Sequence, residues 1–121
     1  MNKQDFNNSI YQDIDMIRGD TLSFNFILNG TGGEMPDFVF SCAEEYSNTP
    51  LFIATNTDGI SLVRYDEIID EALFNVRIDP EKTKNLDLTT YFYDLQMTFN
   101  EDIITLMRGH LKLLYDVTIG G

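Results

Sequence analysis

The feature that most constrains the fold is an alternation of apolar and polar side chains that starts at Thr21. The apolar members of the run fall on one face of an extended segment: Leu22, Phe24, Phe26 and Leu28. The residues between them are mostly polar, with Ile27 as the exception. Because side chains alternate between the two faces of a β-strand, the run predicts a half-buried strand that ends at Asn29–Gly30.

Segments of the same kind recur along the chain and are separated by turn-forming residues. Six more strands are expected, at residues 37–45, 51–55, 60–64, 72–79, 89–99 and 103–117. The stretch 65–72 is too short for a convincing helix, so we interpret it as a hairpin-like connection. The pattern therefore predicts strands throughout and no long helix.

The aromatic content of these strands decides how they are expected to pack. A single sheet would leave several of the aromatic side chains in water, whereas two sheets packed face to face would bury them. We therefore predict an all-β fold, an immunoglobulin-like antiparallel β-sandwich of about seven strands. Residues 1–10 are polar and are expected to form a flexible or partner-ordered arm, and residues 11–121 a single domain.

The tripeptide Arg18-Gly19-Asp20 is best known as an adhesion signal. An adhesion ligand presents it on a mobile loop, but here a well-patterned strand follows at once from Thr21. Gly19 suits a turn position, and the Asp20 carboxylate can accept hydrogen bonds from nearby backbone. We interpret Arg18, Gly19, Asp20 and Thr21 as a structural turn.

Two further places have a predicted structural role. In "DPEKTKNL" we expect a single helical turn, with Asp79 as its cap and Pro80 in its first position. Gly109 lies in the middle of the last expected strand, where a glycine is typical of a β-bulge. Both are expected to shape the backbone and to bind nothing.

The charge balance limits the partners. With 8 Lys and Arg against 20 Asp and Glu, the net charge is −12, which disfavours binding to phosphate backbones. The same charge promotes solubility or docking on a basic partner surface. No apolar run is long enough for a membrane helix, and the N-terminus does not resemble a secretory signal. We expect a protein made in the cytoplasm, with no nucleic acid bound and no membrane insertion.

The residues that could support chemistry are few. Cys42 is the only cysteine, so a disulfide within the chain is impossible, and its strand pattern predicts a buried side chain. His110 is the only histidine, and we expect it on the face opposite Leu111 and Leu113. We expect no catalytic residue, no cofactor and no metal site. The enzyme alternative is a small hydrolase that uses His110 with acidic residues.

Four segments occur in a recognisable order: "IRGDTLSFNF" (17–26), "IDPEKTKNL" (78–86), "YFYDLQMTF" (91–99) and "LMRGHLKLLYDVT" (106–118). Together they resemble the β-sandwich domain of tailed-phage virion proteins from low-GC Gram-positive hosts, with the amino-terminal domain of the upper baseplate protein family as the named example. The segment "GGEMPDF" departs from the family's usual lead into the next strand. The long C-terminal extension of the bridging family members does not follow.

The resemblance implies a structural, non-catalytic virion protein that docks on other virion proteins and is present in many copies. The shorter chain leaves a tail or baseplate position and a head decoration or neck position open. The alternative is a carbohydrate-binding β-sandwich module that assists host attachment. That alternative requires an exposed aromatic platform, for which Tyr46 and Tyr65 are the candidates.

Overall fold

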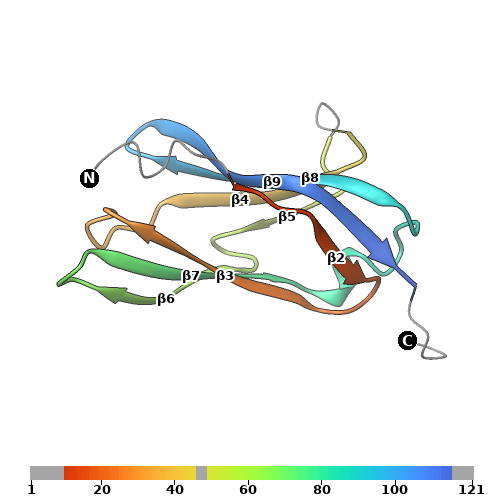
Figure 1. Cartoon of the computed structure of the whole chain (residues 1–121), viewed down its shortest axis with the longest axis horizontal. Helices are drawn as coiled ribbons and strands as arrows, with labels where there is room; N and C mark the ends of the chain where they lie inside the picture. Colours follow the sequence, from red (N-terminus) through yellow and green to blue (C-terminus); the bar gives the residue numbers. More distant parts are fainter. Residues whose placement is uncertain (1–9, 46–48, 116–121) are drawn as a thin grey trace.

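The computed structural model describes residues 10–45 and 49–115, and β-strands dominate it (Figure 1). The nine strands of this part are β1 (Ile10–Tyr11), β2 (Ile14–Ile17), β3 (Leu22–Asn29), β4 (Asp37–Ala43), β5 (Phe52–Thr55), β6 (Ile60–Asp66), β7 (Glu71–Ile78), β8 (Thr90–Phe99) and β9 (Asp102–Leu114). One 3₁₀ turn, η1 (Pro80–Lys82), lies between β7 and β8. No helix among the described residues has the length and apolarity that crossing a bilayer requires.

The strands form two sheets that face each other (Figure 1). One sheet has the order β1-β9-β8-β4-β5, with β2 also paired to β9, and the other has the order β3-β7-β6. The predicted all-β sandwich is therefore confirmed. The described part has nine strands where about seven were expected, because β1 and β2 were missed.

The two missed strands also break the antiparallel rule. Both β1 and β2 run parallel to β9, with Ile10 opposite Met107 and Ile14 opposite Leu111. They contain two and four residues, which is too few for an alternation to be recognised in the sequence. Ile10, expected in the arm, is the first residue of β1, and residues 1–9 of the expected arm lie outside the described residues.

The core lies between the sheets and is built largely from aromatic rings. Phe26 of β3 packs edge-on against Phe38 of β4, with ring centroids 5.2 Å apart, and Phe38 contacts Phe74 of β7 at 4.8 Å. Phe40 stacks on Tyr93 at 5.3 Å. Because these rings come from both sheets, burying them holds the two layers together.

Cys42 is fully buried in β4, as the strand pattern predicted. Burial raises the pKa of its thiol to about 12, because the charged thiolate is poorly solvated there. The thiol therefore behaves as a small apolar side chain and not as a nucleophile.

The expected connection at 65–72 is a hairpin. β6 continues to Asp66, two residues beyond the expected end, and β7 begins at Glu71. Between β8 and β9 the turn is made by Asn100 and Glu101, which have φ values of 50° and 71°. Such angles match the right-handed twist of the flanking strands and make a tight hairpin.

The predicted bulge at Gly109 is wrong. Gly109 pairs in regular register with Tyr93, and the register of β8 and β9 shifts elsewhere, between Leu95 and Gln96, which face Met107 and Thr105. A Cβ at Gly109 would collide with the carbonyl oxygen of Gln12. The glycine is therefore required for close approach of the segment between β1 and β2.

The Arg18-Gly19-Asp20 segment forms a turn between β2 and β3, directly before Thr21. The N–H of Asp20 donates to the carbonyl oxygen of Ile17 at 3.0 Å, and Gly19 has a φ of 83°. Arg18 Nη1 donates to the carbonyl oxygen of Leu86 at 3.0 Å. The arginine is therefore engaged by the protein's own backbone and lies against the segment that follows η1.

Pro80 is the first residue of the 3₁₀ turn η1, as expected, but Asp79 acts differently from the prediction. Asp79 occupies the N-cap position with extended backbone angles, yet its side chain makes no capping hydrogen bond. Its Oδ1 instead accepts a hydrogen bond from Arg77 Nε at 2.9 Å. A carboxylate next to a cation gains a charge-assisted bond, which competes with the cap.

Candidate functional site

One end of the sandwich gathers three connections. The β3–β4 loop (30–36), the β6–β7 turn (67–70) and the β8–β9 turn (100–101) lie together on the left of Figure 1. Loops on a rigid sandwich are where such folds commonly carry contacts with other molecules. This end, called the loop end below, is the candidate functional site.

Asp70 joins two of the three connections. Its carbonyl oxygen accepts a hydrogen bond from the N–H of Gly30 at 2.9 Å, and its Oδ1 accepts one from the N–H of Gly32 at 2.9 Å. The hydroxyl of Tyr65 donates to the same Oδ1 at 2.7 Å, and this bond raises the pKa of the tyrosine. The β6–β7 turn is therefore held in place from both sides by hydrogen bonds.

Two isoleucines lie on this braced turn and face solvent. Ile68 is 90% exposed and Ile69 is 55% exposed. The N–H of Ile68 donates to Asp66 Oδ1 at 3.0 Å, so the backbone that carries the exposed side chain is itself fixed. A large apolar side chain presented on a fixed turn resembles the anchor residues of protein interfaces.

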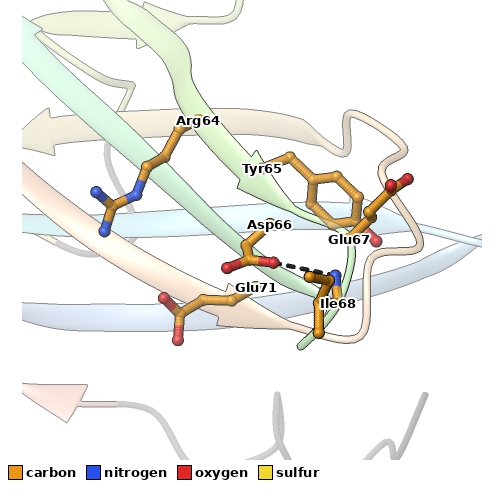
Figure 2. Close-up of a pocket in the computed structure, with 6 residues that line it drawn as sticks. All are labelled: Arg64, Tyr65, Asp66, Glu67, Ile68 and Glu71. Carbon is orange, nitrogen blue, oxygen red and sulfur yellow. Dashed lines mark hydrogen bonds between the residues drawn. The ribbon is translucent and has the colours of Figure 1, made fainter.

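Charged side chains surround the isoleucines. Figure 2 shows the hollow beside the turn, lined by Arg64, Tyr65, Asp66, Glu67, Ile68 and Glu71. Asp66 and Glu71 are directly opposite each other on β6 and β7. Like charges in such a pair repel, and a cation supplied by a partner would relieve the repulsion. The arrangement suits a partner surface with an apolar socket bordered by Lys or Arg.

The carboxylates of the loop end were compared with the groupings that hold metal ions. Within residues 10–45 and 49–115, no three His, Cys, Asp or Glu side chains gather closely enough to hold a metal ion. The predicted turn residues do not contribute to the loop end either. Arg18 to Thr21 and Asp79–Pro80 lie toward the opposite end of the sandwich in Figure 1.

His110 lies on a different surface, beside the segment between β1 and β2. Its ring Nδ1 is 3.2 Å from Asp13 Oδ1 and 2.9 Å from the hydroxyl of Tyr11. The backbone N–H of His110 donates to the same Asp13 Oδ1 at 3.0 Å. The bond from the His110 backbone lowers the pKa of Asp13. As expected, His110 points away from Leu111 and Leu113, which are buried.

The partners of His110 could not be predicted from the sequence, because Asp13 reaches it only through the parallel pairing of β1 and β2 with β9. A histidine oriented by a carboxylate resembles part of a catalytic triad. The one thiol of the chain, Cys42, is buried in the core and cannot serve as the nucleophile of this pair. In the structure these bonds attach the N-terminal strands to the sheet.

The candidate sugar-stacking residues are placed as follows. Tyr65 is half-buried, its hydroxyl is bonded to Asp70, and its ring lies so close to Gly33 that a Cβ there would be 3.2 Å from Cε2. Tyr46 lies outside the described residues. Tyr65 therefore braces the loop end, and its side chain is less exposed than that of Ile68.

No protein-family model matches the chain, and comparison with curated proteins gives no match. The four segments of the resemblance lie in the structure as two contacting pairs. The turn at Gly19 is hydrogen-bonded to Thr83 of the second segment. The third segment lies in β8, and the described part of the fourth lies mostly in the neighbouring strand β9.

Proposed function

We propose that the chain is a structural, non-catalytic component of a tailed-phage virion, either a tail or baseplate protein or a head decoration or neck protein. In this proposal it acts by docking its loop end on a neighbouring virion protein. The ordered resemblance of four segments supports the virion assignment. The observation that carries the docking assignment is Ile68, a large apolar side chain almost fully exposed on a turn braced by Asp70.

The partner is expected to be basic around an apolar socket. Ile68 and Ile69 supply apolar area, and the carboxylates of Asp66, Glu67 and Glu71 lie around them. Opposite charges at the border of an interface speed association and fix its orientation more than they raise affinity. Many copies on one particle would add avidity to a weak single contact.

The experiment is quantitative mass spectrometry of purified phage particles that carry the wild-type chain or a variant. Ile68→Asp places a charge at the proposed anchor. Leu88→Asp is the matched control, because Leu88 is also exposed but lies away from the loop end. We expect wild type and Leu88→Asp in particles at equal copy number and Ile68→Asp strongly depleted.

Two outcomes would contradict separate parts of the proposal. If the wild-type chain is missing from purified particles, the virion assignment is wrong. If Ile68→Asp enters particles as well as Leu88→Asp does, the chain docks through a surface other than the loop end. Far-ultraviolet circular dichroism of both variants checks that each one is folded before the particles are analysed.

A further inference from the structure

β3 is an edge strand without the usual protection against pairing. Among the described residues it pairs with β7 alone, in unbroken register from Leu22 opposite Ile78 to Asn29 opposite Glu71. Edge strands usually carry a charge, a proline or a bulge that prevents them from pairing with another chain. β6, the other edge of the same sheet, has charged residues and a register shift between Leu62 and Arg64. β3 has neither.

The residues of β3 are nearly symmetric about Asn25. In "LSFNFIL" the two phenylalanines flank Asn25 and the two leucines occupy the ends. Two identical strands that pair antiparallel about a two-fold axis at Asn25 would place Phe24 opposite Phe26 of the second copy. The same axis would place Leu22 opposite Leu28 of the second copy. Self-complementarity of this kind is what a two-fold interface between identical chains requires.

The direction of the backbone groups is compatible with this axis. The N–H of Gly30 donates to the carbonyl oxygen of Asp70, which continues the β3–β7 ladder by one residue pair. Hydrogen-bonded pairs alternate along an antiparallel ladder, so Phe24, Phe26 and Leu28 direct their backbone groups toward β7. Ser23, Asn25 and Ile27 direct theirs toward the open edge. A two-fold axis at Asn25 would join these groups in about six hydrogen bonds.

Side-chain exposure and charge also favour a second copy of the chain as the partner of β3. Phe24 and Phe26 are only partly buried although both pack against the core, and Ile27 is 52% exposed. A net charge of −12 opposes association between copies in most orientations. β3 is the longest described strand that contains no Asp, Glu, Lys or Arg. The edge of β3 is therefore a surface at which two copies meet with little repulsion.

We propose that two copies of this chain pair through β3, antiparallel and with the two-fold axis at Asn25, to join their three-stranded sheets into one continuous sheet. The proposal does not depend on virion membership. It predicts a dimer in solution.

The first test is Asn25→Asp measured by sedimentation equilibrium of the full chain. Asn75 Nδ2 donates to Asn25 Oδ1 at 2.9 Å, so an aspartate keeps the acceptor and the fold. In the dimer, however, two carboxylates would face each other across the axis. Ser61→Asp is the matched control, because Ser61 also pairs with Asn75 but lies on the opposite edge of the sheet.

We expect wild type and Ser61→Asp to dimerise alike, and Asn25→Asp to raise the dimer dissociation constant at least about tenfold. A wild-type chain that stays monomeric at every accessible concentration would overturn the proposal. Equal dissociation constants for Asn25→Asp and Ser61→Asp would overturn it as well.

The second test locates the axis by disulfide trapping. Residues in a hydrogen-bonded antiparallel pair have Cα atoms about 5.5 Å apart, which is within the range that a disulfide spans. Asn25→Cys should therefore form a covalent dimer under mild oxidation, and Ser61→Cys should not. Cys42 is buried and does not compete. A dimer that Asn25→Cys fails to trap would place the contact elsewhere and would contradict the proposal.

Discussion

The N–H of Gly19 donates a hydrogen bond of 3.0 Å to Oγ1 of Thr83, which is a fully buried residue. The two residues are far apart in the chain, and each belongs to a segment that the sequence marks as a turn. Their bond joins the β2–β3 turn to the segment after η1. It explains why the Arg18-Gly19-Asp20 tripeptide is part of the framework of the domain.

Removing the acceptor should destabilise the protein. Thr83→Val keeps the shape of the side chain but leaves the N–H of Gly19 without its partner, which we expect to lower the free energy of unfolding by about 1–3 kcal/mol. Urea unfolding measures the change. We expect the dependence of the unfolding free energy on urea concentration to be the same in the variant and the wild type. Thr57→Val, at an exposed position, is the control. An equal loss in both variants would show that the bond contributes nothing specific.

The contact between Gly109 and Gln12 gives a second prediction. Gly109→Ala should push the segment between β1 and β2 away from β9, because the new Cβ would collide with the carbonyl oxygen of Gln12. We expect a loss of about 1–3 kcal/mol, typical of overpacking. Hydrogen exchange should rise in residues 10–17 more than in β3.

Tyr93→Phe tests the same contact without a collision. The hydroxyl of Tyr93 donates to the carbonyl oxygen of Gln12, so its removal should raise exchange in residues 10–17 with a smaller loss of about 1 kcal/mol. Unchanged exchange in those residues for both variants would contradict the assigned role of Gly109.

The β8–β9 turn offers a stabilising change. Glu101 has a φ of 71°, a conformation that glycine adopts without strain and other residues do not. Glu101→Gly should therefore raise the free energy of unfolding by about 0.5–1 kcal/mol, measured by thermal and urea unfolding. Glu34→Gly removes the same charge at a position where φ is not positive, and it should be neutral or destabilising. A fall in stability for Glu101→Gly would count against this turn geometry.

Asp94 should make stability depend on pH. Burial raises the pKa of its carboxyl group above the ordinary value, so the folded state binds more protons than the unfolded state between those two values. Stability contributed by this group is therefore lost as pH rises through that window. Asp94→Asn should gain stability relative to wild type as pH rises from about 3 to about 7.

The measurement is urea unfolding of wild type and Asp94→Asn across that pH range. Asp20→Asn, at an exposed turn position, is the control for removing one negative charge from an acidic chain. A stability difference for Asp94→Asn that stays constant with pH would mean that burial of Asp94 has no effect on its titration.

The features that were predicted correctly from the sequence depend on interactions between residues that are close together in the chain. The two-residue period of Leu22 to Leu28 predicted β3, and the short acidic stretch after Arg64 was correctly interpreted as a hairpin. The burial of Cys42 followed from the strand pattern around it. Each of these features depends on residues within one strand and its turn.

The missed features depend on residues that are far apart in the chain. Asp13 and His110 are 97 positions apart and meet only because β1 and β2 run parallel to β9. Gly109 was predicted as a bulge, since the sequence shows the glycine but not the carbonyl oxygen of Gln12 that lies against it. The bracing of the Ile68 turn by Asp70 likewise requires the β3–β4 loop to be in place.

The sequence by itself determined seven of the nine described strands, through the alternation of apolar and polar side chains, because an extended backbone repeats every two residues regardless of partner. The tertiary structure alone decided which strands are neighbours, that β3 lies at an open edge, and that Ile68 stays exposed on a braced turn. Those outcomes depend on how two sheets of a given size and register bury the same aromatic rings together, and no local period carries that information.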